Sequence, residues 1–333
     1  MKTNVSLKDI AEKVGVSTAL VSYVLNNKLK DRINKDVAAK IRQAAIDLNY
    51  RPNQIARSLK VQKTFTIGLI VADIANPFSS QIARIIEDEA KKSGYSVIFG
   101  SSDERADKTN DLLKLLLDRQ VDGLILSLPE YTEKQVQYLK KINVPFVLID
   151  RYYPTIQSNS VSINNFNASQ KAIQHLLENG HKRIGVVAYQ TSLFHLNERI
   201  RGAVDLLGNN ALIGNVGIQS INEDIIAVID GFLSDPDPVD SIFFTSNLLT
   251  VSGLKYIISL GIKVPDQLAI VGFDETDAFD LFYAPVSYVK QPMAELGRES
   301  VKLLLNSIEN KERIESVELE TELVIRNSSV KAN

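Results

Sequence analysis

Apolar side chains recur at helical spacing in three short stretches near the N-terminus of the chain. The stretches are Leu7–Val14, Val21–Leu25 and Val37–Leu48. Ser6 precedes the first as a helix-capping residue, and Gly15 follows it as a helix-breaking residue. Ser17 and Asn34 precede the second and third stretches in the same way. Two short helices joined by a glycine turn and closed by a third are typical of a helix-turn-helix domain, whose second helix enters the major groove of DNA.

From Phe65 onward the pattern changes to short, unbroken apolar runs separated by amphipathic stretches. The runs that predict strands are Thr66–Ala72, Ser96–Phe99, Gly123–Leu126, Phe146–Ile149, Ile184–Ala188, Ser241–Phe244, Leu268–Phe273 and Glu322–Ile325. Helical stretches lie between them, for example Ser79–Lys92, Lys108–Asp118, Phe166–Glu178, Leu249–Ser259 and Ala294–Ile308. The alternation predicts parallel sheets covered by helices on both faces, arranged as two doubly wound lobes. Ligands in such folds bind at the carboxyl ends of the strands, here across a cleft that a hinge can close.

Charge is divided unevenly between these two parts of the chain. Residues 1–63 carry 13 Lys and Arg against 5 Asp and Glu, whereas the remaining 270 residues carry 25 against 35. The near-neutral total of −2 therefore combines a head of +8 with a body of −10. A basic head attracts DNA phosphates by a sequence-independent and salt-sensitive interaction, and an acidic body stays soluble and off the DNA.

The composition argues against several other classes of protein. There is no cysteine, which removes disulfides, thiolate metal sites and cysteine nucleophiles and fits a reducing cytoplasm. No apolar run reaches the ~20 residues of a membrane helix, and the N-terminus lacks the apolar core of a signal peptide. His175, His181 and His195 lack metal-ligand spacing, and the motifs of serine hydrolases, Walker loops and zinc proteases are missing. We therefore expect a cytoplasmic protein that is not an enzyme, does not contact membranes and uses no cofactor.

Several motifs of the head resemble the lactose/galactose repressor family of transcription regulators. They are Leu7-Lys8-Asp9-Ile10-Ala11, Val14-Gly15-Val16-Ser17, Val21-Ser22, Val24-Leu25-Asn26, Asn49-Tyr50-Arg51-Pro52-Asn53 and Ala56-Arg57-Ser58-Leu59. The resemblance continues through the body, for example in Asn76-Pro77-Phe78, Gly180-His181-Lys182-Arg183-Ile184, Val271-Gly272-Phe273-Asp274 and Val289-Lys290-Gln291-Pro292. It implies that the body has the type I periplasmic-binding-protein fold that the same family uses to sense ligands.

The resemblance also implies which residues contact DNA. Bases would be read by Thr18, Ala19 and Tyr23, and the DNA backbone would be positioned by Ser6, Ser17, Ser22, Asn26, Tyr50 and Arg51. The family usually has Arg where this chain has Tyr23, and Thr where it has Leu20. Since Tyr cannot make the bidentate contact to guanine that Arg makes, the half-site sequence of relatives does not transfer to this chain.

A short amphipathic segment, residues 53–60, follows Pro52 between the head and the body. A helix of this length is unstable alone in water, so the segment is either a hinge helix that orders on DNA or a plain linker. The apolar Leu59 favours the hinge helix. Leu59 resembles the minor-groove wedge of the family, and Ala56 and Lys60 would contact DNA beside it.

A sugar-like ligand needs paired donors and acceptors, which Asp, Asn and Arg at strand ends provide. At the ligand positions of the family the chain has Asp150, Arg199, Asn247 and Asp274, with Phe78 and Ser127 as further candidates. For each of these residues a turn or capping role remains open. The chain departs from the family at Asn164-Asn165 (commonly Asp-Asn), Asn247-Leu248 (commonly Asn-Asp) and Ala168 (commonly Gly), so the ligand class is less defined than the fold.

These features predict a transcription regulator, most simply a repressor, that binds near-palindromic double-stranded operator DNA as a homodimer. A small molecule, a sugar or sugar derivative, would bind between the lobes and change the spacing of the hinge helices. The alternatives are a non-sugar effector such as a nucleobase, an activating role, or an exported sugar-binding protein of the same lobed fold. The head and the missing signal peptide argue against export.

The expected domains follow the changes of pattern along the chain. Residues 1–50 form the helix-turn-helix domain, 51–63 the hinge helix and linker, and 64–333 the effector-binding and dimerisation domain. Within the last, one lobe is expected from residues 64–163 and 292–320, and the other from 164–291 and 321–333.

Overall fold

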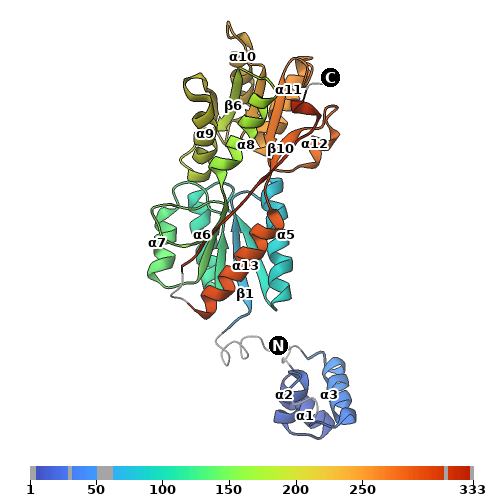
Figure 1. Cartoon of the computed structure of the whole chain (residues 1–333). Coiled ribbons are helices and arrows are strands. Elements are labelled where there is room, and N and C mark those ends of the chain that lie inside the picture. Colours follow the sequence, from blue (N-terminus) through green and yellow to red (C-terminus); the bar gives the residue numbers. More distant parts are fainter. Residues whose placement is uncertain (1–4, 29–31, 51–62, 311–313, 331–333) are drawn as a thin grey trace. The chain divides into compact units, whose positions relative to one another are not determined.

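The computed structural model describes residues 5–28, 32–50, 63–310 and 314–330. The chain divides into two compact units, Met1–Thr64 and Phe65–Asn333, which we call the head and the body. Figure 1 shows the helices of the head and the layered helices and strands of the body.

The head contains α1 (Leu7–Val14), α2 (Thr18–Leu25) and α3 (Lys35–Asp47). Ser6 and Asp9 form a capping box on α1, in which the Ser6 amide donates to the Asp9 carboxylate at 2.7 Å and the Ser6 hydroxyl accepts from the Asp9 amide at 3.4 Å. Gly15 ends α1 at φ 76°, a left-handed conformation that glycine adopts without strain and that turns the chain directly into α2.

The apolar stripes of the three head helices meet in one small core. At its centre Ile10, Val21 and Ile41 are fully buried. The hydroxyl of Ser17 caps α2 by accepting from the Leu20 amide at 3.2 Å, and the side chain of Asn34 caps α3 in the same way. The predicted helix-turn-helix is therefore present, with the expected capping residues.

The body contains two six-stranded sheets, each forming the centre of a lobe. In the first lobe the sheet order is β11-β5-β4-β3-β1-β2, and every pairing is parallel. Its strands are β1 (Thr66–Val71), β2 (Ser96–Ser101), β3 (Gly123–Leu126), β4 (Phe146–Ile149), β5 (Asn159–Ile163) and β11 (Ser316–Leu319). Its helices are α5 (Pro77–Lys92), α6 (Ala106–Asp118), α7 (Glu133–Lys141) and α13 (Met293–Glu309), of which α5 and α13 pack against each other.

The sheet of the second lobe has the order β12-β10-β9-β8-β6-β7 and is parallel except for β12, which pairs antiparallel with β10. Its strands are β6 (Ile184–Tyr189), β7 (Leu212–Val216), β8 (Ser241–Phe244), β9 (Ala269–Phe273), β10 (Ser287–Lys290) and β12 (Glu322–Val324). Its helices are α8 (Asn165–Glu178), α9 (Phe194–Leu207), α10 (Ile221–Ser234), α11 (Asn247–Ser259) and α12 (Asp277–Leu281), with the short helices η1 (Gly208–Asn210) and η2 (Asn327–Ser329). The expected fold class, a helical head and two doubly wound lobes, is confirmed.

The chain passes between the lobes three times: from β5 to α8, from β10 to α13, and from β11 to β12. The long crossing near the C-terminus is visible as the red segment that runs between the two lobes in Figure 1. Each lobe therefore contains segments that are far apart in the sequence, and each sheet has an edge strand from the C-terminal part of the chain.

The eight strands expected from the sequence are all present, but the described residues contain twelve. The four that the pattern did not reveal are β5, β7, β10 and β11. β5 is buried along its whole length although it contains Asn159, Ser160 and Ser162, so it does not read as an apolar run. These polar side chains are accommodated because the edge of the sheet supplies partners: Ser160 bonds Ser316 at 3.1 Å, and Asn159 accepts from the Glu315 amide at 2.8 Å.

The helices α8 and α9 approach each other closely, and this approach positions the site described below. A side-chain carbon on Gly202 of α9 would lie only 2.1 Å from the carbonyl oxygen of Phe166 in α8. Glycine is thus required at this contact. The close packing places Arg199 of α9 against Asn165 at the start of α8.

Candidate functional site

The second helix of the head presents a polar surface opposite its buried side. Thr18, Ala19 and Tyr23 are exposed, Tyr23 to 42%, whereas Val21 and Val24 are buried. Ser22 is half-buried. The arrangement gives α2 one face in the core and one face available to the edges of bases.

Several flanking polar residues of the head already take part in local hydrogen bonds. The hydroxyls of Ser6 and Ser17 accept from backbone amides, and the Ser6 hydroxyl also donates to the Asp9 carboxylate at 2.9 Å. The Ser17 hydroxyl keeps a proton that it can donate to a phosphate. The Asn26 side chain donates to the Ser22 carbonyl at 2.8 Å. Tyr50 is half-buried against the head core, and burial raises its pKa. Arg51, Ala56, Leu59 and Lys60, with the predicted hinge helix, lie outside the described residues.

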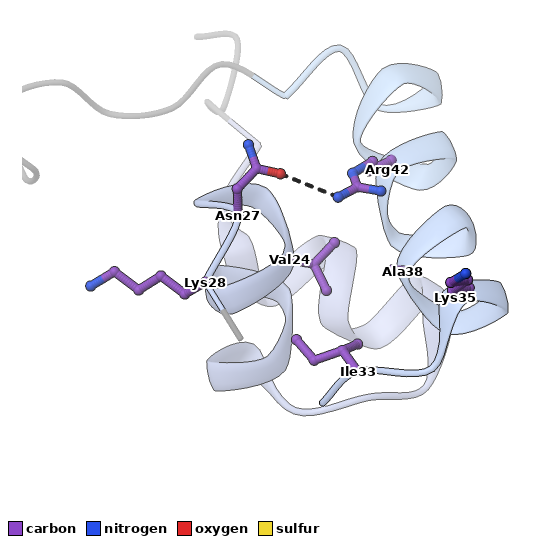
Figure 2. Close-up of a pocket in the computed structure, with 7 residues that line it drawn as sticks. All are labelled: Val24, Asn27, Lys28, Ile33, Lys35, Ala38 and Arg42. Atoms are coloured by element: carbon purple, nitrogen blue, oxygen red, sulfur yellow. Dashed lines mark hydrogen bonds between the residues drawn. The ribbon is translucent and has the colours of Figure 1, made fainter. Parts of the chain in front are cut away.

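A cavity of about 330 Å³ lies between the end of α2 and α3 in the head (Figure 2). It is lined by Val24, Asn27, Lys28, Ile33, Lys35, Ala38 and Arg42. Arg42 reaches from α3 to donate to the side-chain oxygen of Asn27 at 3.3 Å. The floor of the cavity is apolar, and three cationic side chains lie at its rim. These cations add positive charge beside the surface of α2. The sequence pattern does not predict this cavity.

In the body, charged side chains gather where the carboxyl ends of the strands of the two lobes face each other. We call Asp150, Arg151, His195, Arg199 and Asp274 the interlobe cluster. Asp150 directly follows β4 and Asp274 directly follows β9, with φ of 64° and 67°. Asp is one of the residues that tolerate this left-handed conformation, which turns the chain sharply at the strand end. Both aspartates are buried.

Arg199 is buried and already holds two partners within its lobe. Its Nε donates to Asn165 Oδ1 at 2.7 Å and its Nη1 to the Thr245 carbonyl at 2.8 Å. The guanidinium also lies 3.6 Å from the centre of the Phe273 ring. Burial lowers the pKa of Arg199, and the charges of Asp274 and Asp150 oppose that effect. Arg199 is thus an anchored part of the wall of the site.

Asp274 and Asn247 are also engaged. Asp274 accepts a hydrogen bond from Gln291 Nε2 at 2.6 Å, and burial raises its pKa while the charge of Arg199 lowers it. The Asn247 side chain accepts from the Leu248 amide at 2.7 Å and donates to Asn76 Oδ1 of the first lobe at 3.2 Å. Asn247 therefore connects the lobes.

Asp150 and His195 face each other from different lobes. His195 Nε2 lies 3.8 Å from Asp150 Oδ2, too far for a hydrogen bond. Burial raises the pKa of Asp150 to about 6, against the opposing charges of Arg199 and Arg151. Burial and then the charges of Arg151 and Arg199 hold the pKa of His195 well below its ordinary value of 6.5, so His195 is neutral near pH 7.

Arg151 binds Glu104 through two hydrogen bonds of 2.8 and 2.7 Å, a bidentate pair within the first lobe. This pairing uses both terminal nitrogens of the guanidinium. The charges of Glu104 and Arg151 also act on Tyr189, which lies at the end of β6. Burial raises the pKa of Tyr189 to about 12, so its hydroxyl stays protonated.

Four polar atoms at this place are buried with no hydrogen-bond partner among the residues that the structure describes. They are Asp150 Oδ1, Arg151 Nε, His195 Nδ1 and Gln291 Oε1. Buried polar groups in proteins are almost always paired, so such a concentration marks a place where a further molecule belongs. The interlobe cluster with Gln291 is therefore the candidate ligand site.

A separate contact, which we call the interlobe clasp, joins the lobes beside the cluster. Glu130, in the loop after β3, accepts hydrogen bonds at one carboxylate oxygen from the hydroxyls of Thr191 and Ser192, both at 2.8 Å, and from the Ser192 amide. Burial raises the pKa of Glu130, but these hydrogen bonds and the charge of Arg151 outweigh it and lower the pKa below its usual value. Glu130 is thus ionised at neutral pH.

The remaining two candidates from the sequence are Phe78 and Ser127, and the Phe78 amide donates at 3.0 Å to the same Asn76 Oδ1 that accepts from Asn247. Phe78 is half-buried at the start of α5 and packs against the apolar core. Ser127 is buried just after β3, where its amide donates to the Ile70 carbonyl at 2.8 Å.

Comparison with known proteins places the chain in a family. Residues 6–53 match the family of bacterial regulatory proteins described as the lacI family, and residues 173–329 match the periplasmic binding protein-like domain. The chain is 32% identical to catabolite control protein A of Priestia megaterium over 94% of this chain and 95% of that one. It is 31% identical to the ribose operon repressor of Halalkalibacterium halodurans over 97% of each.

The chain belongs to the lacI family.

Solved structures of this lacI-type architecture agree with the fold. A lac repressor dimer bound to operator and the anti-inducer ONPF superposes with a TM-score of 0.86 at 23% identity, covering 99% of this chain and all of that one. A lacI-family regulator from Enterococcus faecium with bound ribose gives a TM-score of 0.71 at 26% identity, covering 80% of this chain and all of that one.

Membership of the lacI family makes the chain a transcriptional regulator, and the relatives are regulators rather than enzymes. Within the described ranges, no group of three His, Asp or Glu side chains is placed to hold a metal ion. Over those same residues, no helix is both long and apolar enough to cross a membrane.

Asp150, Arg199, Asn247 and Asp274 were predicted from the sequence, and their ligand role stays a prediction; the partners that surround them in the structure were not predicted. Arg151 carried a usable signal, since it directly follows a predicted strand-end aspartate. Gln291 lies in one of the motifs that resemble the family. For other partners, such as Glu130, the sequence offers no local signal, because their role depends on contact with the other lobe.

Proposed function

We propose that this lacI-family member is an operator-binding repressor whose DNA affinity is set by a small polar effector bound at the interlobe cluster. The four unpaired buried atoms at the facing strand ends carry this proposal, because they supply an unfilled set of donors and acceptors inside a two-lobed sensor. The relatives named as repressors favour repression over activation. The ribose-bound regulator supports a sugar rather than a nucleobase.

The operator-binding part of the proposal rests on the exposed face of α2. We infer that Thr18, Ala19 and Tyr23 read bases, and that Ser6, Ser17, Ser22, Asn26, Tyr50 and Arg51 bind the DNA backbone. Ala56, Leu59 and Lys60 of the hinge segment would contribute to the minor-groove contact. The lac repressor dimer on operator supports a homodimer on a near-palindromic site, with one head in each half-site.

The effector-binding part of the proposal assigns Asp150, Arg199, Asn247 and Asp274 to the ligand site. Arg199 also stabilises the wall of the site, and Asn247 also connects the two lobes. Phe78 and Ser127 remain predicted at its edge. Catalysis plays no part in this proposal, since the relatives act by binding. The domain division at residues 50 and 63, and a cytoplasmic location, are part of the same proposal.

The operator role is tested with DNA sites selected from a random duplex pool by the full-length protein. Tyr23→Ala should weaken binding to the selected site by roughly 1–3 kcal/mol, the value of a lost base contact, while binding to a scrambled duplex is unchanged. Tyr138→Ala removes another exposed tyrosine, 52% exposed on α7, and serves as the matched control. Equal affinity of the Tyr23→Ala and parent proteins for the selected site, measured by fluorescence anisotropy, would show that α2 does not read it.

A further inference from the structure

Two titratable side chains, Asp150 and His195, meet where the two lobes face each other. Asp150 follows β4 of the first lobe and His195 belongs to α9 of the second, with 3.8 Å between Asp150 Oδ2 and His195 Nε2. Both side chains are buried, and their other ring and carboxyl atoms, Asp150 Oδ1 and His195 Nδ1, have no hydrogen-bond partner among the described residues. A carboxylate and an imidazole nitrogen both accept protons, so a proton at this contact has one acceptor in each lobe.

Burial and the neighbouring charges decide which of the two side chains holds such a proton in this closed arrangement. Burial penalises ions, so it favours a carboxylic acid beside a neutral imidazole over a carboxylate beside an imidazolium. The guanidiniums of Arg151 and Arg199 repel an imidazolium and attract a carboxylate. Burial is the larger effect on both partners, because it raises the pKa of Asp150 to about 6 and, with the guanidiniums, holds the pKa of His195 well below 6.5. The other ionisable groups that act on this site, among the described residues, are Asp274, Glu104 and Tyr189.

Opening of the lobes reverses this preference. Water then reaches both side chains, and the pKa values return towards the ordinary 3.8 of an aspartate and 6.5 of a histidine. In mildly acidic solution the open pair is therefore an imidazolium and a carboxylate, whereas the closed pair is a neutral imidazole and a carboxylic acid. Each arrangement holds one proton, on opposite lobes.

We propose that closing of the lobes transfers a proton from His195 to Asp150. The N–H bond at Nε2 of the imidazolium breaks, its electron pair stays on the nitrogen, and an O–H bond forms at Asp150 Oδ2, which then donates to Nε2. No ion pair is buried and no proton is exchanged with the solvent, so closing is nearly independent of pH. This device goes beyond the proposed function, since it requires neither an effector nor an operator.

Removing either partner should expose a pH dependence, and the two variants should show opposite signs. In His195→Leu only Asp150 titrates at the contact; its pKa rises on closing, so closing takes up a proton and is favoured as the pH falls below about 6. In Asp150→Asn only His195 titrates there; its pKa falls on closing, so closing releases a proton and is disfavoured as the pH falls below 6.5. Each effect should reach the order of tenfold at pH 5, because one pKa unit corresponds to a factor of ten.

Hydrogen exchange of the full-length protein without ligand measures the closing. The Ser192 amide of the second lobe donates to Glu130 of the first, so its protection is lost when the lobes open. Glu130 does not disturb the comparison, because its pKa is lowered and it stays ionised over this pH range. From pH 7.5 to 5, protection corrected for the chemical exchange rate should stay within about threefold in the parent protein, rise about tenfold in His195→Leu and fall about tenfold in Asp150→Asn.

Two control variants keep the interlobe pair intact. His175→Gln removes another buried histidine, which bonds Ser329 within the second lobe, and Asp118→Asn removes an exposed carboxylate at the end of α6. Both should show the pH profile of the parent protein. Slopes of the same sign in His195→Leu and Asp150→Asn, no slope in either, or a parent slope as steep as theirs would overturn the proposal.

NMR of the parent protein gives a second measurement, which does not depend on how well the variants fold. The chain has three histidines, so the imidazole nitrogen spectrum is simple. We expect the ring of His195 to stay neutral from pH 7.5 to 5, while the carboxyl carbon of Asp150 titrates at about pH 6. An imidazolium at His195 together with a carboxylate at Asp150 at pH 5 would show that no proton is transferred on closing, and the proposal would fail.

Discussion

Replacing Glu130 by Gln should loosen the contact between the two lobes. In the interlobe clasp one ionised carboxylate oxygen accepts from the Thr191 hydroxyl, the Ser192 hydroxyl and the Ser192 amide. Hydrogen bonds to a charged acceptor each contribute about 1.5–3 kcal/mol, and neutral ones about 0.5–1.5 kcal/mol. Glu130 is half-buried, so solvent screens part of the difference, and the amide of Gln keeps one accepting oxygen. We expect a net loss of about 2 kcal/mol, which corresponds to roughly thirtyfold more frequent opening of the clasp.

Hydrogen exchange measures this opening without knowledge of the effector. The Ser192 amide is protected by its hydrogen bond to Glu130, so a peptide covering residues 190–195 should exchange faster in Glu130→Gln, up to roughly thirtyfold. Glu133→Gln, on an exposed carboxylate in the first turn of α7, is the matched control and should leave exchange unchanged.

A double-mutant cycle then isolates the contact itself. Ser192→Ala removes one hydroxyl donor of the clasp and keeps the backbone amide. If the two side chains interact, the combined effect of Ser192→Ala and Glu130→Gln on exchange should be smaller than the sum of the single effects. Unchanged exchange of residues 190–195 in Glu130→Gln, or strict additivity in the cycle, would refute the clasp as an energetic link between the lobes.

Three further predictions concern the stability of the body. Gly202→Ala should lower the free energy of unfolding by at least about 2 kcal/mol in urea titrations, because the added carbon would lie 2.1 Å from the Phe166 carbonyl oxygen. Arg199→Ala should cost about 3–5 kcal/mol in the same assay, since it breaks a buried charged network. Burial lowers the pKa of His175, which bonds Ser329 at 2.7 Å, so the unfolded chain takes up the proton first. His175 should therefore lower the melting temperature as the pH drops below 6.5, and this contribution is the difference between the parent protein and His175→Gln.

Each of these predictions has a control on the same chain. Gly231→Ala, where an added carbon meets nothing within 4 Å, should be neutral or stabilising by about 0.4–1 kcal/mol. Arg201→Ala, on an exposed arginine two positions from Arg199, should change unfolding by less than about 1 kcal/mol. His175→Gln should lose only the contribution of His175 to the pH slope, because buried His195, whose pKa is also lowered, keeps its own. A Gly202→Ala or Arg199→Ala protein that is as stable as its control would contradict the packing argument. An unchanged pH slope in His175→Gln would contradict the titration argument.

The sequence predicts most of the fold because the lobe strands are continuous apolar runs. Gly123–Leu126, Phe146–Ile149 and Ser241–Phe244 begin and end where the pattern predicted. β5 could not be found in this way, since Asn159 and Ser160 are buried only because residues 315 and 316 arrive beside them from the far end of the chain. A local sequence pattern predicts burial well when the buried side chains are apolar. It predicts burial poorly when the buried side chains are polar and their partners come from distant parts of the chain.

The same distinction applies to the candidate ligand site. Asp150 and Asp274 could be predicted, because an acidic residue at the end of a buried parallel strand is a local signal. Only tertiary packing shows that Arg199 is held by Asn165 rather than free. The unpaired atoms of Gln291 and His195 likewise follow only from tertiary packing. The exposed face of α2, on which the proposed DNA-reading residues lie, was easier to predict, since the buried and exposed faces of α2 follow directly from helical periodicity.

The third crossing between the lobes has a consequence for how the protein is made. Residues 316–319 complete the sheet of the first lobe as β11, and residues 322–324 complete that of the second as β12. Ser328 then donates to the Ile270 carbonyl at 2.6 Å and accepts from the Ser287 amide at 2.8 Å, which fastens η2 to the second lobe. Neither lobe can reach its final form on the ribosome until these residues have been translated. A premature stop codon just before residue 316 would therefore leave two unfinished sensor lobes attached to a head that has its own core.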